Sequence, residues 1–308
     1  MEYSESSYAV ATDYRMKIIV DWDSPILAFK ANRERYTNPH QYAGSPRLSS
    51  SHSEDAITWN VFRSLQKTGK LDIITSKVGI GEPRGLLLWA VAPEPDGESA
   101  MLQYVTGSVM RKIDGIFPGQ INAPDVVLLG TTGVVVVVVC KQSEQAEAQH
   151  QWEGELDRVK HLRMCLREYE EVHPVIPKED APDEEREAAV PEKYPGIIQD
   201  GTSDEALTPV WRLVSMALLA KELGVCFKVE PAVVTIASTR QWSEKFTETG
   251  KSASDLWKMF GGMLGKDAPR CDLIFWQHLP GLIDTIRLAD LKTNLLTRPL
   301  LYDVDPSA

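Results

Sequence analysis

Apolar residues repeat in some segments with the period of an α-helix. Within residues 51–69 the repeat has a spacing of four, and it is formed by Ile57, Val61 and Leu65. Side chains at that spacing share one face of a helix. Ser51 followed three residues later by Glu54 is a capping-box pattern, and Gly69 is typical of a helix C-terminus. We therefore predict a helix over 51–69 with one buried face.

Other runs are rich in apolar and β-branched residues, as strands are. We expect strands at residues 16–20, 71–80, 84–93, 227–238 and 271–277. The pattern predicts helices at residues 145–172, at residues 208–224 and between the last two strands. Residues 104–117 are compatible with either a short helix or a loop.

Two strongly apolar runs, 124–130 and 133–141, flank a Gly-Thr-Thr-Gly turn, which predicts a β-hairpin. Both runs are apolar throughout, so we expect central strands that are covered on both faces. Helices interleaved with buried strands indicate an α/β protein with a mixed central sheet flanked by helices. We expect one domain over residues 1–308.

The acidic charge of the chain is concentrated in one segment. Residues 174–206 contain ten acidic and three basic residues, so they supply −7 of the formal net charge of −11 and leave −4 for the rest. This Pro-rich segment has too little apolar surface to pack, and we expect a mobile insertion that meets a protein partner. The acidic total neither excludes nor supports a nucleic-acid partner, because a local basic face matters more than the sum.

The cysteines and the chain start exclude several classes of protein. The four cysteines form no Cys-x-x-Cys pair, so neither a zinc ribbon nor a thioredoxin-like motif is expected. The first residues lack the basic start and apolar core of a signal peptide, and no apolar run is long enough to span a bilayer. We expect a cytoplasmic protein without a membrane partner. The oligomeric state is left open.

Three polar residues stand where a metal-dependent nuclease needs them. Glu54 is on the early helix, Asp125 follows Pro124 at the start of the hairpin, and Lys141 ends its second strand. This order resembles the PD-(D/E)XK nuclease superfamily, which has the restriction-endonuclease-like fold, over roughly residues 48–172. The resemblance implies that Asp125 and a second acid bind Mg²⁺ or Mn²⁺, while Lys141 positions the attacking water. Such a site hydrolyses phosphodiester bonds, with DNA favoured over RNA as substrate.

The sequence departs from the family pattern at one position. Two residues before Lys141 the family has Asp or Glu, and this chain has Val139, which cannot bind a metal. Some members of the superfamily carry the missing acid on the following helix, about a dozen residues beyond the lysine. Glu153 and Glu155 stand at that distance, and Glu155 fits the swapped arrangement better. If Val139 replaces a catalytic acid, a Val139→Glu substitution should restore cleavage.

The hairpin loop provides a separate test, because opposite residues of an antiparallel pair point to the same face. A loop of three residues, 131–133, sets Asp125 opposite Val139 and puts Lys141 on the face of Asp125. A loop of Thr131 and Thr132 alone sets Asp125 opposite Val138 and turns Lys141 to the other face. The catalytic hypothesis requires an odd loop or a bulge.

Each of these residues also has an ordinary structural explanation. Glu54 would close a capping box, Asp125 would serve a turn, Lys141 would be a solvated strand end, and Glu155 would lie on a wet helix face. Three hypotheses therefore stay open. The chain is an active nuclease, a degenerate nuclease-fold protein that binds nucleic acid or assembles with a partner, or an unrelated α/β adaptor. The resemblance also implies that Trp211 and Arg212 border the candidate site.

Overall fold

The computed structural model describes residues 18–28, 30, 53–114, 123–140, 196–243, 251–283 and 288–297. These residues form a five-stranded sheet in the order β1-β2-β3-β4-β5. The strands are β1 (Pro83–Leu88), β2 (Val126–Gly130), β3 (Gly133–Val139), β4 (Glu230–Ala237) and β5 (Arg270–Phe275). Neighbouring strands are antiparallel from β1 to β3 and parallel from β3 to β5, so the sheet is mixed.

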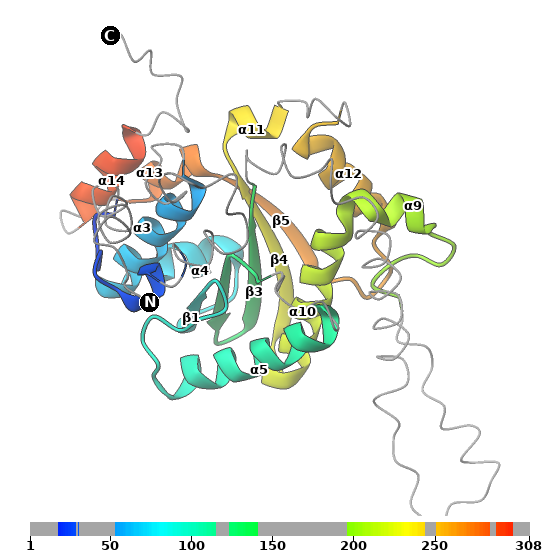
Figure 1. The fold of residues 1–308 in the computed structure, drawn as a ribbon, viewed down its shortest axis with the longest axis horizontal. Helices are drawn as coiled ribbons and strands as arrows, with labels where there is room; N and C mark the ends of the chain where they lie inside the picture. Colours follow the sequence, from blue (N-terminus) through cyan, green and yellow to red (C-terminus); the bar gives the residue numbers. More distant parts are fainter. Residues whose placement is uncertain are drawn as a thin grey trace, which may run out of the picture.

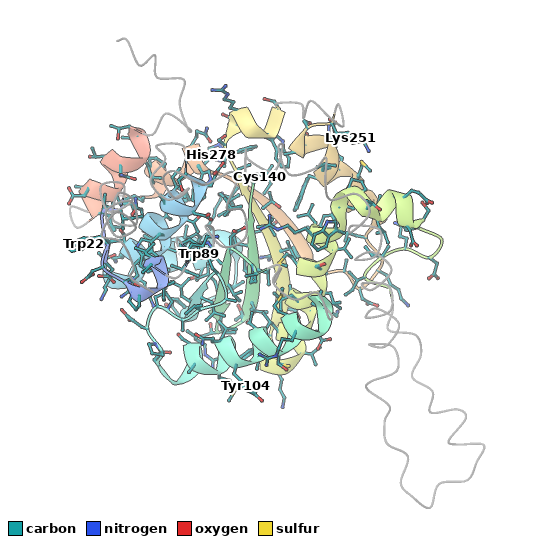
Figure 2. All side chains as sticks on the ribbon, viewed as in Figure 1. Trp22, Trp89, Tyr104, Cys140, Lys251 and His278 are labelled. Carbon is teal, nitrogen blue, oxygen red and sulfur yellow. The ribbon has the colours of Figure 1, made fainter. Side chains whose placement is uncertain are left out.

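Helices cover both faces of the sheet, which confirms an α/β arrangement with a mixed sheet (Figure 1). One layer contains α3 (Glu54–Lys67), α4 (Asp72–Val78), α13 (Leu279–Leu282) and α14 (Ala289–Leu296). The other contains α5 (Gly97–Asp114), α10 (Trp211–Phe227) and α12 (Ala253–Met263). We call these the α3 layer and the α10 layer. In Figure 2 Trp89 lies among the side chains of the α3 layer, whereas Tyr104 projects outward from α5.

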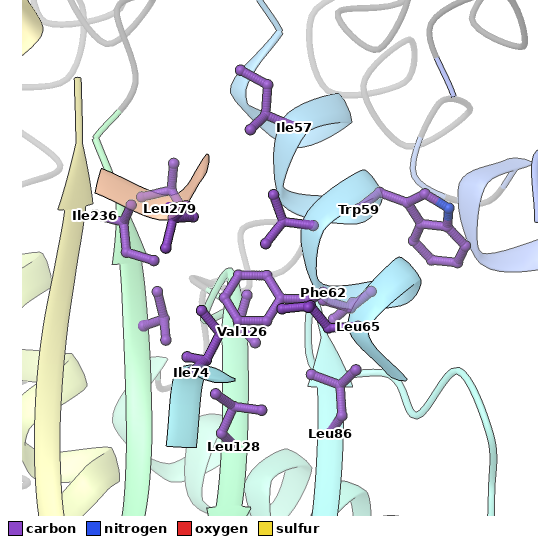
Figure 3. Close-up of a cluster of buried hydrophobic side chains, with 14 of the residues drawn as sticks. Ile57, Trp59, Phe62, Leu65, Ile74, Leu86, Val126, Leu128, Ile236 and Leu279 are labelled. Atoms are coloured by element: carbon purple, nitrogen blue, oxygen red, sulfur yellow. The ribbon is translucent and has the colours of Figure 1, made fainter. Parts of the chain in front are cut away.

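The uninterrupted valines of β3 are explained by burial on both sides. Val135, Val137 and Val139 pack into the core of the α3 layer, and the alternating Val134, Val136 and Val138 pack into the core of the α10 layer. Successive side chains of a strand point to opposite faces of the sheet. A central strand that is covered by helices on both faces therefore has no position where a polar side chain would reach water. Figure 3 shows the α3 side of this core, where Phe62 and Leu65 face Val126 and Leu128.

Two expected strands are absent from the described residues. The segment 71–80 forms helix α4, because its buried residues Leu71, Ile74, Thr75 and Val78 follow the helical spacing of three and four. A short apolar run does not by itself distinguish a helix from a strand. Residues 18–20 of the expected first strand make no strand pairing in the described part of the chain.

Helix boundaries differ from the predicted ones by a few residues. The N-cap of α3 is Ser53 instead of Ser51, and its hydroxyl oxygen accepts a hydrogen bond from the amide of Ala56 at 3.1 Å. Helix α10 begins after a short 3₁₀ turn at Thr208–Val210 and continues past Gly224 to Phe227. The ambiguous segment 104–117 belongs to helix α5 as far as Asp114.

Part of the expected acidic insertion is folded onto the α10 layer. The backbone amide of Gln199 donates to the carbonyl of Met263 at 2.8 Å, and Ile197 and Ile198 are buried. A short helix, α9 (Asp204–Leu207), follows with Ser203 as its N-cap. Residues 196–206 of the expected insertion therefore have defined structure and buried contacts, and whether the segment is mobile stays a prediction. Residues 174–195, which carry the rest of the acidic segment, lie outside the described residues.

The tip of the hairpin fits closely against the residue that follows α4. A Cβ atom added to Gly130 would lie 2.1 Å from the carbonyl oxygen of Ile80, and one added to Gly133 would lie 2.6 Å from the Ile80 side chain. The carbonyl of Ile80 also accepts a hydrogen bond from the amide of Thr132 at 3.0 Å. The two glycines allow the hairpin to pack directly against the chain that connects α4 to β1.

We predict that Gly130→Ala lowers the free energy of unfolding by about 3 kcal/mol, at the upper end of the overpacking range, because its methyl group meets backbone. Gly261→Ala is the matched control. It lies on α12 with nothing within 4 Å of an added Cβ, and we expect it to be neutral or stabilising by up to about 1 kcal/mol. Urea denaturation of both variants measures the difference, and equal midpoints would contradict the prediction.

Candidate functional site

Asp125 joins three separate parts of the molecule at one end of the sheet. Its backbone carbonyl accepts a hydrogen bond from the amide of Trp89 at 3.0 Å. Its carboxylate oxygen Oδ2 accepts one from the amide of Val139 at 2.9 Å and one from the guanidinium of Arg212 at 3.2 Å. Asp125 therefore connects the turn after β1, the end of β3 and the start of α10.

The carboxylate of Asp125 is buried and ion-paired. The residue is 1% exposed, and the side chain of Arg212 is 22% exposed. A carboxylate in such a place needs both a counter-charge and hydrogen-bond donors, and Arg212 and the Val139 amide supply them. The expectation that Arg212 borders the sheet end of Asp125 is confirmed.

The hairpin loop contains an even number of residues. Val126 pairs with Val137 and Leu129 with Val134, so the loop consists of Thr131 and Thr132. Continued by one residue, this register sets Asp125 opposite Val138 and not opposite Val139. A shared face of Asp125 and Lys141 requires an odd number of loop residues or a bulge, and this regular two-residue loop provides neither. Lys141 itself lies outside the described residues, so its role stays a prediction.

Val139 is turned away from the carboxylate of Asp125. Its side chain is buried in the core of the α3 layer, whereas the carboxylate of Asp125 bonds to Arg212 of the α10 layer. Only the backbone amide of Val139 reaches Asp125. Cys140 continues the backbone pairing of β3, since its amide donates to the carbonyl of Ile236 at 2.9 Å.

Glu54 begins α3, and Asp55 beside it has a defined structural role. Both residues are buried. The carboxylate of Asp55 pairs with the ammonium of Lys30 at 3.3 Å and accepts a hydrogen bond from the indole of Trp89 at 3.3 Å. The ring of Trp89 stacks on Trp59, with centroids 5.9 Å apart. Sequence reasoning missed Asp55 and Trp89, because no local pattern links a helix start to a residue on a distant turn.

Trp89 has an unusual backbone conformation. Trp89 and Ala90 have φ angles of +52° and +65°, and Leu88 and Val91 on either side exchange backbone hydrogen bonds at 2.8 and 3.0 Å. A left-handed conformation at two successive residues other than glycine costs energy, of the order of 1 kcal/mol each. The stacking on Trp59 and the bonds to Asp55 and Asp125 hold the turn in that conformation.

The described residues do not form a metal site. Among the ranges that the structure covers, no three His, Cys, Asp or Glu side chains converge to hold an ion. Glu54 and Asp125 belong to no such group there. Glu153 and Glu155 lie outside those ranges. The carboxylate expected to bind Mg²⁺ is bonded to Arg212 instead. The Asp125 site, as described, therefore does not fit a magnesium ion.

Comparisons with protein families, with curated proteins and with solved structures found no match to this chain. In the described residues no helix is both long enough and apolar enough to cross a membrane.

We predict a coupling free energy of about 1.5–3 kcal/mol between Asp125 and Arg212, the range for hydrogen bonds to charged groups. The measurement is a double-mutant cycle of Asp125→Asn and Arg212→Gln, followed by urea denaturation. The ion pair of Arg84 and Glu98 is the control, because both of its side chains are exposed, and a coupling below about 1 kcal/mol is expected there. Equal couplings for the two pairs would show that burial adds nothing at Asp125.

Proposed function

We propose that the protein is a catalytically degenerate member of the restriction-endonuclease-like fold that binds nucleic acid without cleaving it. The order of elements supports this assignment. A helix begins at Glu54, a hairpin strand follows Asp125, and a later helix carries Arg212 beside Asp125. The first two elements follow the order of the PD-(D/E)XK resemblance, and Lys141, its third residue, lies outside the described residues.

The observation that carries the proposal is the pairing of Asp125 with Arg212. In a metal-dependent nuclease the aspartate at this position gives its oxygen lone pairs to a cation. Here Oδ2 accepts hydrogen bonds from the Arg212 guanidinium and the Val139 amide. The carboxylate stabilises the fold at this end of the sheet, and the absence of an acid at 139 agrees with that role.

The charge distribution is compatible with a nucleic-acid ligand. The acidic segment 174–206 accounts for most of the net negative charge, and the rest of the chain carries −4. Arg240 belongs to α11 (Thr239–Ser243), which follows β4 at the sheet end that carries Asp125. Local cations at the ligand matter more for phosphate binding than the total charge. The acidic segment itself is proposed to contact a protein partner.

We predict that the purified protein binds labelled DNA or RNA equally well in Mg²⁺ and in EDTA and cleaves neither. The measurements are fluorescence anisotropy for binding and gel electrophoresis for cleavage, in Mg²⁺, Mn²⁺ or EDTA, beside Lys141→Ala. Cleavage that requires the metal and is lost in Lys141→Ala would overturn the degenerate assignment. If the protein binds none of these nucleic acids, the proposal that its ligand is a nucleic acid is wrong.

An active nuclease is the second candidate, and one observation favours it. Glu54 and Asp125 are both buried carboxylates, and Asp55, next to Glu54, is connected to Asp125 through Trp89. An active nuclease would need Lys141 and Glu155, which lie outside the described residues, and a metal-binding role for Asp125 that its ion pair with Arg212 opposes. The cleavage assay decides between the two candidates, and Glu155→Gln would identify the swapped acid if cleavage occurs.

We predict that Val139→Glu does not restore cleavage and instead destabilises the fold by several kcal/mol. The Val139 side chain lies in the apolar core of the α3 layer, where a new carboxylate would be buried among hydrocarbon side chains. Val139→Ile keeps the site apolar and is the matched control, with a cost below about 1.5 kcal/mol. Metal-dependent cleavage by a folded Val139→Glu protein would contradict the position assigned to this side chain.

A further inference from the structure

Residues 18–28 and Lys30 lie along helix α3, and we call them the N-terminal strap. The indole of Trp59 on α3 donates a hydrogen bond to the carbonyl of Val20 at 2.8 Å, and Figure 3 shows this indole directed toward the strap. Leu27 is fully buried in the core of the α3 layer. The strap is therefore packed as part of that layer.

The turn after β1, residues 88–91, is held in a conformation that its residues do not favour. Its central residues, Trp89 and Ala90, both have positive φ angles, and Leu88 and Val91 are hydrogen-bonded across it. Two positive φ angles in a two-residue hairpin turn favour Asn and Gly. A strained turn of this kind persists only where its surroundings hold it, and such turns are found at sites that change conformation. We call residues 88–91 the Trp89 turn.

The strap contacts the Trp89 turn through Lys30. The Lys30 ammonium lies 5.1 Å from the centroid of the Trp89 ring and 3.3 Å from the carboxylate of Asp55. The same carboxylate accepts the hydrogen bond of the Trp89 indole at 3.3 Å. A cation, an indole and a carboxylate are therefore in mutual contact, and the charge of Lys30 stabilises the ring in its present position.

A second connection passes through Arg63 of α3. Its guanidinium, on a residue that is 5% exposed, pairs with Asp21 of the strap at 2.5 Å and with Glu94, beyond the Trp89 turn, at 2.8 Å. Lys67 lies 3.5 Å from both carboxylates. A buried guanidinium is stable only with its counter-charges in place. The strap and the segment after the Trp89 turn therefore share one buried cation.

The Trp89 turn is connected in its turn to the end of β3. The Trp89 amide donates to the backbone carbonyl of Asp125 at 3.0 Å, and the Val139 amide donates to the Asp125 carboxylate at 2.9 Å. A change in the conformation of the turn reaches β3 through this single residue. The strap, the Trp89 turn and the Asp125 end of the sheet therefore form one continuous set of contacts.

We propose that the Trp89 turn is a conformational switch that couples the N-terminal strap to the Asp125 end of the sheet. With the strap in place, Lys30 and Arg63 hold the turn in its left-handed conformation. When the strap contacts are lost, the turn relaxes to negative φ angles and the Trp89 amide leaves the Asp125 carbonyl. Backbone strain favours this local opening over opening elsewhere in the sheet. The switch goes beyond the proposed function and does not depend on the ligand.

The test is amide hydrogen exchange of the full chain, followed by NMR. Lys30→Met keeps the length of the side chain and removes its charge, and we expect the Trp89 amide to exchange about tenfold faster. The Val139 amide should exchange faster as well, because its acceptor is Asp125. The Thr132 amide, at the other end of the hairpin, should keep its rate. Lys30→Arg keeps the charge and should behave as the wild-type protein.

Ala90→Gly separates stored strain from simple packing. Glycine adopts the φ of +65° without penalty, so adding it to Lys30→Met should slow exchange of the Trp89 amide roughly fivefold. In a turn without strain, the added freedom of glycine would speed exchange instead. Asp55→Asn, which removes the counter-charge and keeps an acceptor for the indole, is a second variant with the same expectation as Lys30→Met. Lys77→Met, at an exposed lysine of α4, is the matched control and should change no rate.

Four outcomes would overturn the proposal. Unchanged exchange of the Trp89 amide in Lys30→Met would show that the strap does not hold the turn. Equal acceleration of the Thr132 amide would show a loss of global stability in place of a local switch. Faster exchange on adding Ala90→Gly would show that the turn stores no strain. An unchanged Val139 amide would show that the turn does not act on Asp125.

Discussion

The buried carboxylate of Asp125 is the interaction on which this end of the molecule depends. It receives the Val139 amide and the Arg212 guanidinium, while its own backbone carbonyl receives the Trp89 amide. The hairpin, helix α10 and the strained turn after β1 therefore meet at one residue. Removing one partner of a buried pair leaves the other charge uncompensated, which costs more than the pair contributes. The same demand for a counter-charge competes with metal binding, because Arg212 already neutralises the carboxylate.

The hairpin turn determines which chemistry the sheet end can have. Two residues, Thr131 and Thr132, separate β2 from β3. This loop length fixes which side chains of β2 and β3 point to the same face of the sheet. Val139 is thereby committed to the α3 layer and Asp125 to Arg212 of the α10 layer. One more loop residue would reverse every assignment on β3. The close contact of Gly130 and Gly133 with Ile80 holds the turn at its present length.

The elements with long apolar runs or regular spacing were predicted correctly from the sequence. The prediction was wrong where the apolar run was short. The hairpin, β4, β5 and the helices α3 and α10 were expected, because long apolar runs and regular spacing have one interpretation. Residues 71–80 were expected as a strand, although their buried positions fit a helix equally well. The Asp125–Arg212 pair spans 87 residues, and only the resemblance suggested that they would be neighbours. The bond of Asp55 to Trp89 had no sequence signal, because it depends on how α3 packs against the β1 turn.

The Asp125–Arg212 pair bears on both parts of the proposed function, the absence of cleavage and the binding of nucleic acid. An unpaired aspartate would repel the phosphates of a nucleic acid unless a metal ion lay between them. With Arg212 paired to Asp125, that repulsion is largely cancelled without a metal. A carboxylate neutralised by Arg212 is therefore consistent with the proposed binding of a nucleic-acid strand without cleavage.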